Sequence, residues 1–410
     1  MVGLPSTAFN HLKLLYQINS IFMKTVGFIV VITLILGIYS LLNYYIIRNG
    51  LPLTDNQPPV WRNLFIWGVV FLAASFLIGR FTERVSVNFV STALIWIGSF
   101  WLAIMIYLVL QLAMIDLARG LDKLFHFFPA FLSANPEMVR KGVSLVVVGV
   151  TILVVLIGHI NTWFPVINKI QIPIDKQAGN LKSLHIVAFS DVHLGTIIEK
   201  RHLRGIVNQV NALNPDIILI PGDIIDEDIS PVIHTNVGEV MLQLRAKYGV
   251  YAVTGNHEYI GGVNKAKEYL TNHGIKLLSD TAVLIDDSFY VVGREDLAIG
   301  QFSGKRRKEL SDIVNDLNTS KPMILLDHQP IGLAQAESTG IDLQLSGHTH
   351  HGQLWPFNYI TNRIFEVSRG LIKKGNTHIL VSSGIGGWGP PVRTNSRPEI
   401  LDITLTFGKN

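Results

Sequence analysis

Hydrophobic residues follow two different patterns along this 410-residue chain. Four long runs that contain no Asp, Glu, Lys or Arg come first, at residues 27–47, 63–79, 85–115 and 142–164. A helix needs about 20 mostly apolar residues to cross a hydrocarbon core about 30 Å thick. The second run is short for this purpose, and the third is long enough to tilt. After an N-terminal segment, residues 1–26, the pattern predicts an α-helical transmembrane domain of about four spans, residues 27–164, and not a cleaved signal peptide or a soluble helical core.

The second pattern consists of short, β-branched runs that each end in polar residues. They alternate with amphipathic helical stretches and are bounded by Gly, Pro and Asp, which is typical of an α/β domain with buried strands. We expect a polar linker at 165–183 and this domain at 184–410. The predicted strand regions are 184–193, 216–225, 248–258, 289–296, 322–330, 341–350, 377–386 and 399–407, and the predicted helices are 200–213, 234–247, 263–273 and 305–317.

Composition supports this division into two parts. Mean hydropathy is +0.36 and only 16% of residues are charged, which is too apolar for a wholly soluble protein. Through Lys182 there are 13 Lys and Arg against 6 Asp and Glu, and afterwards 21 against 24. The expected location is therefore the cell membrane, with the lipid bilayer as partner. Basic residues in the short loops weigh against a cytoplasmic catalytic domain, whereas those after the last span offset them, so both sides stay open. The sequence does not define an oligomeric state.

Several kinds of chemistry are excluded. The chain has no cysteine, which rules out disulfides, thiolate metal sites and cysteine nucleophiles. It also lacks a nucleotide-binding glycine loop followed by Lys and Ser or Thr, and a serine nucleophile elbow. No nucleic-acid partner is expected.

Polar side chains gather where the predicted strands end, and the stretch "SGHTHHG" (346–352) has three histidines in four positions. In sheets of this kind ligands bind at the carboxyl ends of the strands. Carboxylates, imidazoles and an amide oxygen suit divalent Mn, Fe, Zn or Co, and the set is too large for one tetrahedral ion. Two ions with a bridging carboxylate can activate water for attack on phosphorus. The residues concerned are Asp191, His193, Asp223, Asn256, His257, His328, His348 and His350.

The ordered motifs resemble those of the calcineurin-like metallophosphoesterase superfamily. They are "DVH" (191–193), "GD" (222–223), "GNHE" (255–258), "DH" (327–328) and "GHTH" (347–350), and they extend over residues 184–407. Together with the spans, they resemble a membrane-anchored bacterial-type branch related to UDP-2,3-diacylglucosamine pyrophosphatase-like members. The resemblance implies a four-layer αββα sandwich with the metal site at the carboxyl ends of the strands.

The resemblance also assigns roles to the matching residues. One metal falls to Asp191, His193 and His350, the other to Asn256, His328 and His348, and Asp223 bridges them. His257 corresponds to the family's catalytic histidine, which protonates the leaving alkoxide or steadies phosphoryl charge. Two divalent ions are implied as cofactors, with Mn²⁺ favoured over Fe or Zn.

Five further features have open interpretations. Glu258 either orients His257 or forms a surface ion pair, and His351 should point away from the metals. Arg393, after the glycine-rich stretch "GIGGWGPPV" (384–392), either binds a substrate phosphate or belongs to an ordinary turn. Arg294 and Asp296 belong either to the wall of the site or, as the favoured interpretation, to a structural ion pair. The basic cluster "GKRRKE" (304–309), at an expected helix start, either contacts anionic lipid or, as the favoured interpretation, is a solvated helix end.

The resulting hypothesis is an enzyme, a membrane-anchored dinuclear metal-dependent phosphoesterase. It cleaves a phosphodiester, phosphomonoester or pyrophosphate bond by attack of metal-activated hydroxide. The anchor makes a lipid-linked substrate reasonable. One similar branch of the family cleaves the pyrophosphate of a UDP-linked diacylglucosamine. The alternatives are a soluble substrate for the same chemistry and a catalytically inactive membrane sensor or binding protein.

Overall fold

A computed structural model describes the backbone of residues 6–408 and the side chains of residues 26–408 apart from Phe28 and Ser133. The chain divides into two compact units. The first comprises Met1–Ala73 and Met105–Gly149, and the second comprises Ala74–Ile104 and Val150–Asn410. The divisions between these units fall within long helices. Most of the predicted N-terminal segment, 1–26, lies outside the residues whose side chains are described.

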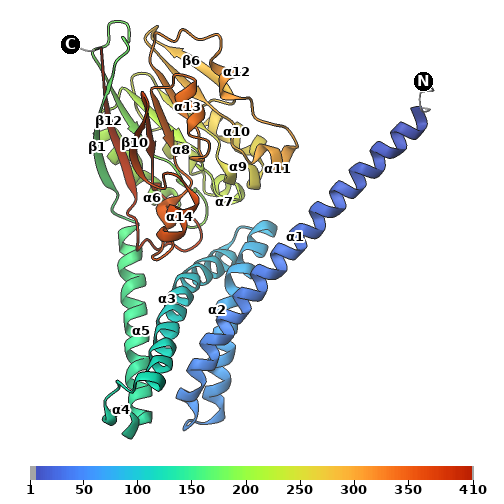
Figure 1. Cartoon of the computed structure of the whole chain (residues 1–410), viewed down its shortest axis with the longest axis vertical. Helices are drawn as coiled ribbons and strands as arrows, with labels where there is room; N and C mark the ends of the chain where they lie inside the picture. The colour runs from blue at the N-terminus through green and yellow to red at the C-terminus, as the bar shows by residue number, and fades with distance from the viewer. Residues whose placement is uncertain (1–5, 409–410) are drawn as a thin grey trace. The chain divides into compact units, whose positions relative to one another are not determined.

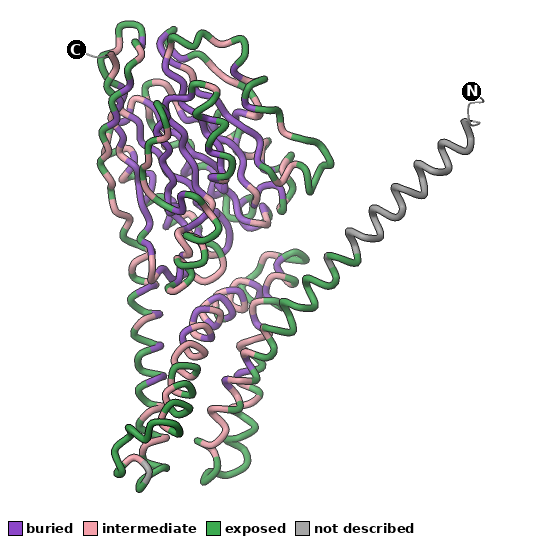
Figure 2. Tube along the Cα trace, viewed as in Figure 1, coloured by how far each residue is buried: buried purple, intermediate pink, exposed green. Residues whose placement is uncertain are grey.

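Among the described residues, four helices are long and apolar enough to cross a membrane. Many of their apolar residues are exposed (Figure 2), such as Leu41 and Leu145 with 66% and 76% exposure, which suits contact with lipid rather than water. The protein is therefore a multi-pass membrane protein, as predicted. The long helices are α1 (Ser6–Gly50), α2 (Pro59–Val85), α3 (Phe89–Phe125) and α5 (Pro136–Asn161), and between them lie the 3-10 helix Leu51–Thr54 and the short α4 (Ala130–Ala134).

The rest of the chain forms two six-stranded mixed sheets (Figure 1). The first has the order β1-β12-β2-β3-β4-β5, and the second has the order β10-β11-β9-β8-β7-β6. Strands of the first sheet are β1 (Val166–Ile174), β12 (Glu399–Phe407), β2 (Ser183–Ala188), β3 (Ile217–Pro221), β4 (Val250–Val253) and β5 (Lys276–Leu277). Strands of the second are β10 (Gly370–Lys374), β11 (Thr377–Val381), β9 (Leu343–Ser346), β8 (Met323–Leu326), β7 (Phe289–Gly293) and β6 (Thr281–Ile285).

Helices cover the outer faces of both sheets. They are α6 (Lys200–Ala212), α7 (Ser230–His234), α8 (Gly238–Met241), α9 (Asn256–Gly261), α10 (Val263–Asn272), α11 (Ile299–Ser303), α12 (Leu310–Val314), α13 (Ala334–Ser338) and α14 (Asn358–Ile364), with a 3-10 turn at His350–Gly352. One apolar core, including Ile186 and Leu345, fills the space between the sheets. A second packs α6 and α10 on the first sheet, and a third packs α12 and α13 on the other. These layers confirm the predicted αββα sandwich.

Residues 165–183, expected to form a linker, contain a strand instead. β1 pairs in parallel with β12 at the opposite end of the domain sequence, with Val166 opposite Glu399. Along β1 exposed and partly buried residues alternate, so one face of the strand is polar. That polar face, together with the prolines, gave the segment the composition of a loop.

Two predicted helices are shorter than expected because tertiary hydrogen bonds hold the backbone elsewhere. After α8, the side chain of Asn211 donates to the carbonyl of Gln243 and accepts from the amide of Arg245. Before α12, the carboxylate of Asp280 accepts from the amide of Lys308 at 2.8 Å. The basic cluster at 304–309 is consequently an extended connection and not a helix start.

Candidate metal centre

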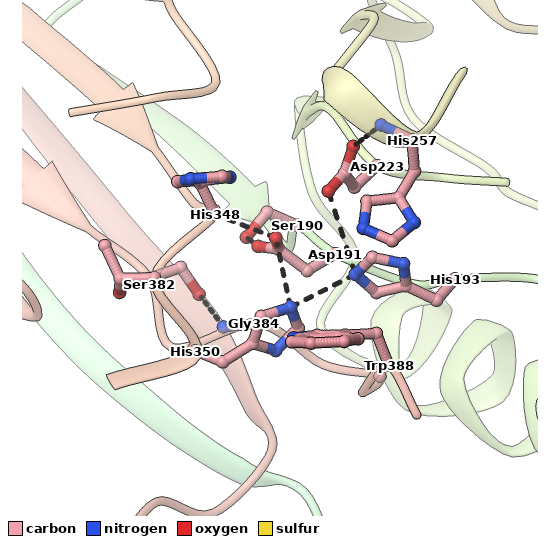
Figure 3. A network of polar contacts seen from close by, with 12 residues as sticks. Ser190, Asp191, His193, Asp223, His257, His348, His350, Ser382, Gly384 and Trp388 are labelled. Atoms are coloured by element: carbon pink, nitrogen blue, oxygen red, sulfur yellow. Dashed lines mark hydrogen bonds and ion pairs between the residues drawn. The ribbon is translucent and has the colours of Figure 1, made fainter. Parts of the chain in front are cut away.

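All seven predicted ligands follow strand ends, and the sheets bring them to one edge. β2, β3 and β4 are parallel neighbours, as are β8 and β9, so the loops after them meet. Figure 3 shows Asp191, His193, Asp223 and His350 of this cluster lying close together, with dashed lines joining them. Asp191 and His193 follow β2, Asp223 follows β3, Asn256 begins α9 after β4, His328 follows β8, and His348 and His350 follow β9.

The backbone is strained at the same positions. Asp191, His193, Asp223, His348 and His350 have φ between +46° and +71°, a region that side-chain-bearing residues rarely adopt. A glycine is needed beside them, because a Cβ on Gly222 would lie 2.6 Å from the ring of His328. The "GD" motif therefore combines a residue that permits close approach with the carboxylate that uses it.

One set of donors consists of Asp191, His193 and His350, all buried, whose ligand atoms lie within 4.8 Å of one another. The Nε2 atoms of the two histidines are 3.1 Å apart, and Oδ1 of Asp191 is 3.5 Å from Nε2 of His350. Two neutral imidazoles that point lone pairs at each other repel unless a proton or a cation lies between them. This geometry fits one divalent cation.

A second set consists of Asp223, His328 and His348. Nδ1 of His328 donates to the carbonyl of Pro221 at 2.8 Å, which leaves Nε2 free as a ligand atom. That Nε2 lies 3.2 Å from Oδ1 of Asn256. Asp223 extends toward both sets, because its Oδ2 is 3.1 Å from His328 and 3.8 Å from His193. The carboxylate thus lies between the two sets of donors.

Electrostatics favour the ligand forms of Asp223, His348 and His350. Burial raises the pKa of Asp191, and although burial lowers the pKa of His328, the charge of Asp223 more than offsets this and holds it well above its usual value. Burial by itself would raise the pKa of Asp223. His328 and the neighbouring histidines lower it by more than burial raises it, so the pKa of Asp223 is well below its usual range. Burial and then the nearby His328 lower the pKa of His348 to about 3. Burial and then the nearby His193 hold the pKa of His350 well below its usual value. Ionised carboxylate and neutral imidazole are the states that bind a metal.

His257 lies beside this centre without belonging to either predicted ligand set. Its backbone amide donates to Oδ1 of Asp223 at 2.9 Å, and its Nδ1 donates to Oδ1 of Asp226 at 3.1 Å. Burial lowers the pKa of His257, but the hydrogen bond to Asp226 and the carboxylate charges more than offset this and raise it to about 9. The ring is therefore equipped to hold a proton near the centre.

Glu258 does not orient His257, contrary to one of the two sequence interpretations. Its carboxylate accepts from the backbone amides of Ile225 and Gly255 at 2.8 and 2.7 Å, and it is buried instead of forming a surface ion pair. It fixes the two ligand loops to each other. The orienting group for His257 is Asp226, which the sequence reasoning missed. The available signal was a second carboxylate in "GDIID" (222–226), three residues after Asp223.

Arg393 is fully buried, and its guanidinium donates to carbonyls of Gly384 and Gly386 and to Oγ of Ser396. These bonds favour the ordinary-turn interpretation over phosphate binding, since they occupy donors that a substrate would need. They hold the glycine-rich segment in place against the strand ends.

The other open features have structural partners. His351 turns its Nδ1 to Oγ of Ser368 at 2.7 Å, away from the metal ligands. Arg294 pairs with Asp327 and not with Asp296, which instead accepts from Gln329.

Two further residues near His257 were not expected at the site. The ring of Trp388 lies 6.4 Å from that of His257, and 53% of the tryptophan is exposed. Nη2 of Arg80, in α2, donates to Oδ2 of Asp226 at 2.7 Å. A charge next to an apolar run usually marks only the end of a span, so the sequence offered no reason to connect Arg80 with the distant motifs.

Comparison with known proteins agrees with this geometry. The family model for calcineurin-like phosphoesterases matches residues 184–352. The chain is 36% identical over 236 residues to an uncharacterized metallophosphoesterase of Campylobacter jejuni, covering 57% of this chain and 62% of that protein. It is 32% identical over 269 residues to a transmembrane protein with metallophosphoesterase domain from Danio rerio, covering 62% and 61% respectively.

The matches to the Campylobacter and Danio proteins thus span 62% and 61% of those relatives' length. A shorter relative is covered almost completely. An uncharacterized metallophosphoesterase of Aquifex aeolicus is 30% identical over 258 residues, which make up 62% of this chain and 97% of that protein. With this shared sequence and a buried set of donors where the motifs predict it, the chain belongs to the calcineurin-like metallophosphoesterase family.

Proposed function

We propose that this protein is a membrane-anchored hydrolase of phosphoric esters or anhydrides that uses two divalent cations. The observation that carries the proposal is the placement of Asp223 between two sets of buried donors, with His257 beside them. Asp191, His193 and His350 would hold one ion, and Asn256, His328 and His348 the other, with Asp223 shared. Their mixed nitrogen and oxygen donors suit Mn²⁺, Fe or Zn²⁺.

When bound, such a pair of cations supplies positive charge for the phosphoryl oxygens and an activated water as nucleophile. The residues of the chain itself position the substrate. The carboxylates and imidazoles fix the position of the reacting phosphorus, since their rigid loops are held by Glu258 and by the bonds of Arg393. No covalent intermediate with the protein is required.

His257 is proposed as the general acid. A departing alkoxide or phosphate needs a proton in proportion to its basicity, and histidine can donate one near neutral pH. With Nδ1 donating to Asp226, the other ring nitrogen is the one available to the leaving group. The raised pKa keeps this proton in place until the bond breaks.

A lipid-linked substrate is supported by the apolar surface near the site. Trp388 beside His257 is half exposed, and the segment after His350 carries exposed apolar side chains. These are Trp355 (46%), Tyr359 (66%), Ile360 (53%) and Ile364 (67%). Exposed groups of this kind next to a polar centre match a substrate with a charged head and an apolar tail. The bond cleaved, including a lipid pyrophosphate, is part of the proposal.

The test uses the full-length protein purified in detergent. Elemental analysis should find about two divalent ions per chain, consistent with a dinuclear site. Hydrolysis is then followed with Mn²⁺ on bis-p-nitrophenyl phosphate, on phospholipids and on a lipid pyrophosphate. Activity on all three with equal efficiency would argue against a lipid role. Failure to cleave any of them with either Mn²⁺ or Zn²⁺ would instead support a membrane sensor or binding protein.

A further inference from the structure

The last turns of α2 carry a charged pair where an apolar helix ends. Nη1 of Arg80 and Oε2 of Glu83 are 3.2 Å apart, one turn from each other. Their side chains are only 19% and 1% exposed, whereas the neighbouring Arg84 is exposed. Burying such charges is costly unless each has a partner. Arg80 and Glu83 therefore face protein, and Arg84 shows what an ordinary arginine at a span end does.

The partners of this pair lie in the loops that carry metal ligands. Arg80 donates to Asp226 at 2.7 Å, three residues after Asp223. Glu83 accepts a hydrogen bond from the hydroxyl of Thr196, three residues after His193. Arg80, Glu83 and both loops belong to the same compact unit. The end of α2 is thus bonded to the loop after β2 and to the loop after β3.

Asp226 connects Arg80 to His257. One carboxylate oxygen, Oδ2, binds the guanidinium, and the other, Oδ1, accepts from His257 at 3.1 Å. Asp226 is buried, with 7% exposure, so it has little water to replace a lost partner. Its Oδ1 also lies 3.7 Å from Nδ1 of His193. Without Arg80, the carboxylate can turn toward other donors and release the ring of His257 from its present orientation.

We propose that Arg80 is a positioning residue of the active site, which holds Asp226 and through it His257. Helix α2 then contributes a residue that positions the catalytic groups, in addition to anchoring the domain to the membrane. This inference rests on the proposed hydrolase activity and on the role of His257 as acid. It predicts that replacing Arg80 slows protonation of the leaving group by His257, and therefore slows hydrolysis most for substrates with basic leaving groups.

The experiment compares Arg80→Gln, Arg80→Lys and Arg84→Gln in the full-length protein in detergent, loaded with Mn²⁺. Each is assayed on two diesters, one with a p-nitrophenolate leaving group and one with a more basic alkoxide. We expect Arg80→Gln to lower kcat on the alkoxide substrate by roughly 10- to 100-fold, with a smaller loss on the p-nitrophenyl substrate, because only the basic leaving group needs the proton. Metal content should be unchanged, Arg80→Lys should recover part of the rate, and Arg84→Gln should behave as wild type.

A double substitution separates positioning from general stabilisation. If Arg80 acts through His257, Arg80→Gln adds no further loss in a His257→Ala background. Additive losses, equal losses on both substrates, or loss of metal would overturn the inference, as would identical rates for Arg80→Gln and Arg84→Gln. Should Arg80→Gln not be recovered folded, the same comparisons are made with Arg80→Lys, which keeps the charge but not the planar fork. An inactive wild-type protein would instead overturn the proposed function itself.

Discussion

The proposed metal ligands and the proposed acid, His257, are held in place by different parts of the molecule. On one side the donors Asp191, His193, Asp223, His328 and His350 are held by strained loops and by bonds within the α/β fold. On the other side His257 is held by Asp226, which depends in turn on Arg80 in a membrane helix. The first side is held mainly by bonds within the α/β domain, with Glu83 of α2 bonded to Thr196 beside it, whereas the second side is in contact with Arg80 of α2 through Asp226. Binding of cations and transfer of the proton should therefore fail separately.

The largest effect is expected at Asp223, the proposed bridging carboxylate. Asp223→Ala should remove bound metal and lower hydrolysis by more than about 1,000-fold, because both ions lose a shared ligand. Elemental analysis and the rate on bis-p-nitrophenyl phosphate measure the two losses together. A variant that kept both ions and most of its rate would show that Asp223 does not bridge.

His257→Ala should lower kcat by roughly 100-fold on a substrate with a basic leaving group while leaving the metal content intact. The loss should shrink for p-nitrophenolate, which departs without a proton. Comparing kcat for the two substrates with metal analysis of the same sample sharpens the contrast with Asp223. Loss of metal from this variant would place His257 among the ligands and remove the distinction between the two sides.

Asp226→Asn should have a smaller effect, about 10-fold near neutral pH, with a change in the pH profile. The charged form of His257 is the acid, so activity falls as pH rises through its pKa, which the carboxylates raise to about 9. Removing the Asp226 charge lowers that pKa, and the fall in kcat/KM should begin at lower pH. An unchanged alkaline limb would argue that Asp226 does not act on His257.

Trp388→Ala should have the mildest effect and change neither metal binding nor proton transfer by His257. If its half-exposed ring contacts the apolar part of a lipid substrate, KM for that substrate rises about 3-fold, while the rate on bis-p-nitrophenyl phosphate stays the same. Equal losses on lipid and soluble substrates would mean that Trp388 only supports the loop.

The elements whose sequence shows a local pattern, such as an apolar run or a strand followed by a motif, could be predicted from the sequence. The four apolar runs and the strands before each motif correspond to observed elements, and the ordered motifs placed the ligands at one sheet edge. β1 was missed because its strand character depends on pairing with β12, more than 200 residues away in the chain. The roles of Asp226 and Arg80 were missed for the same reason, because their ion pair joins residues that are far apart in the sequence.

The strained backbone of the five ligands has an evolutionary consequence. Left-handed conformations in residues other than glycine cost on the order of 1 kcal/mol or more each, and here they accumulate in a handful of neighbouring turns. A descendant freed from hydrolysis would gain stability by drifting to glycine or asparagine at those positions. If the protein is the proposed hydrolase, selection for catalysis keeps its folded state less stable than this architecture permits.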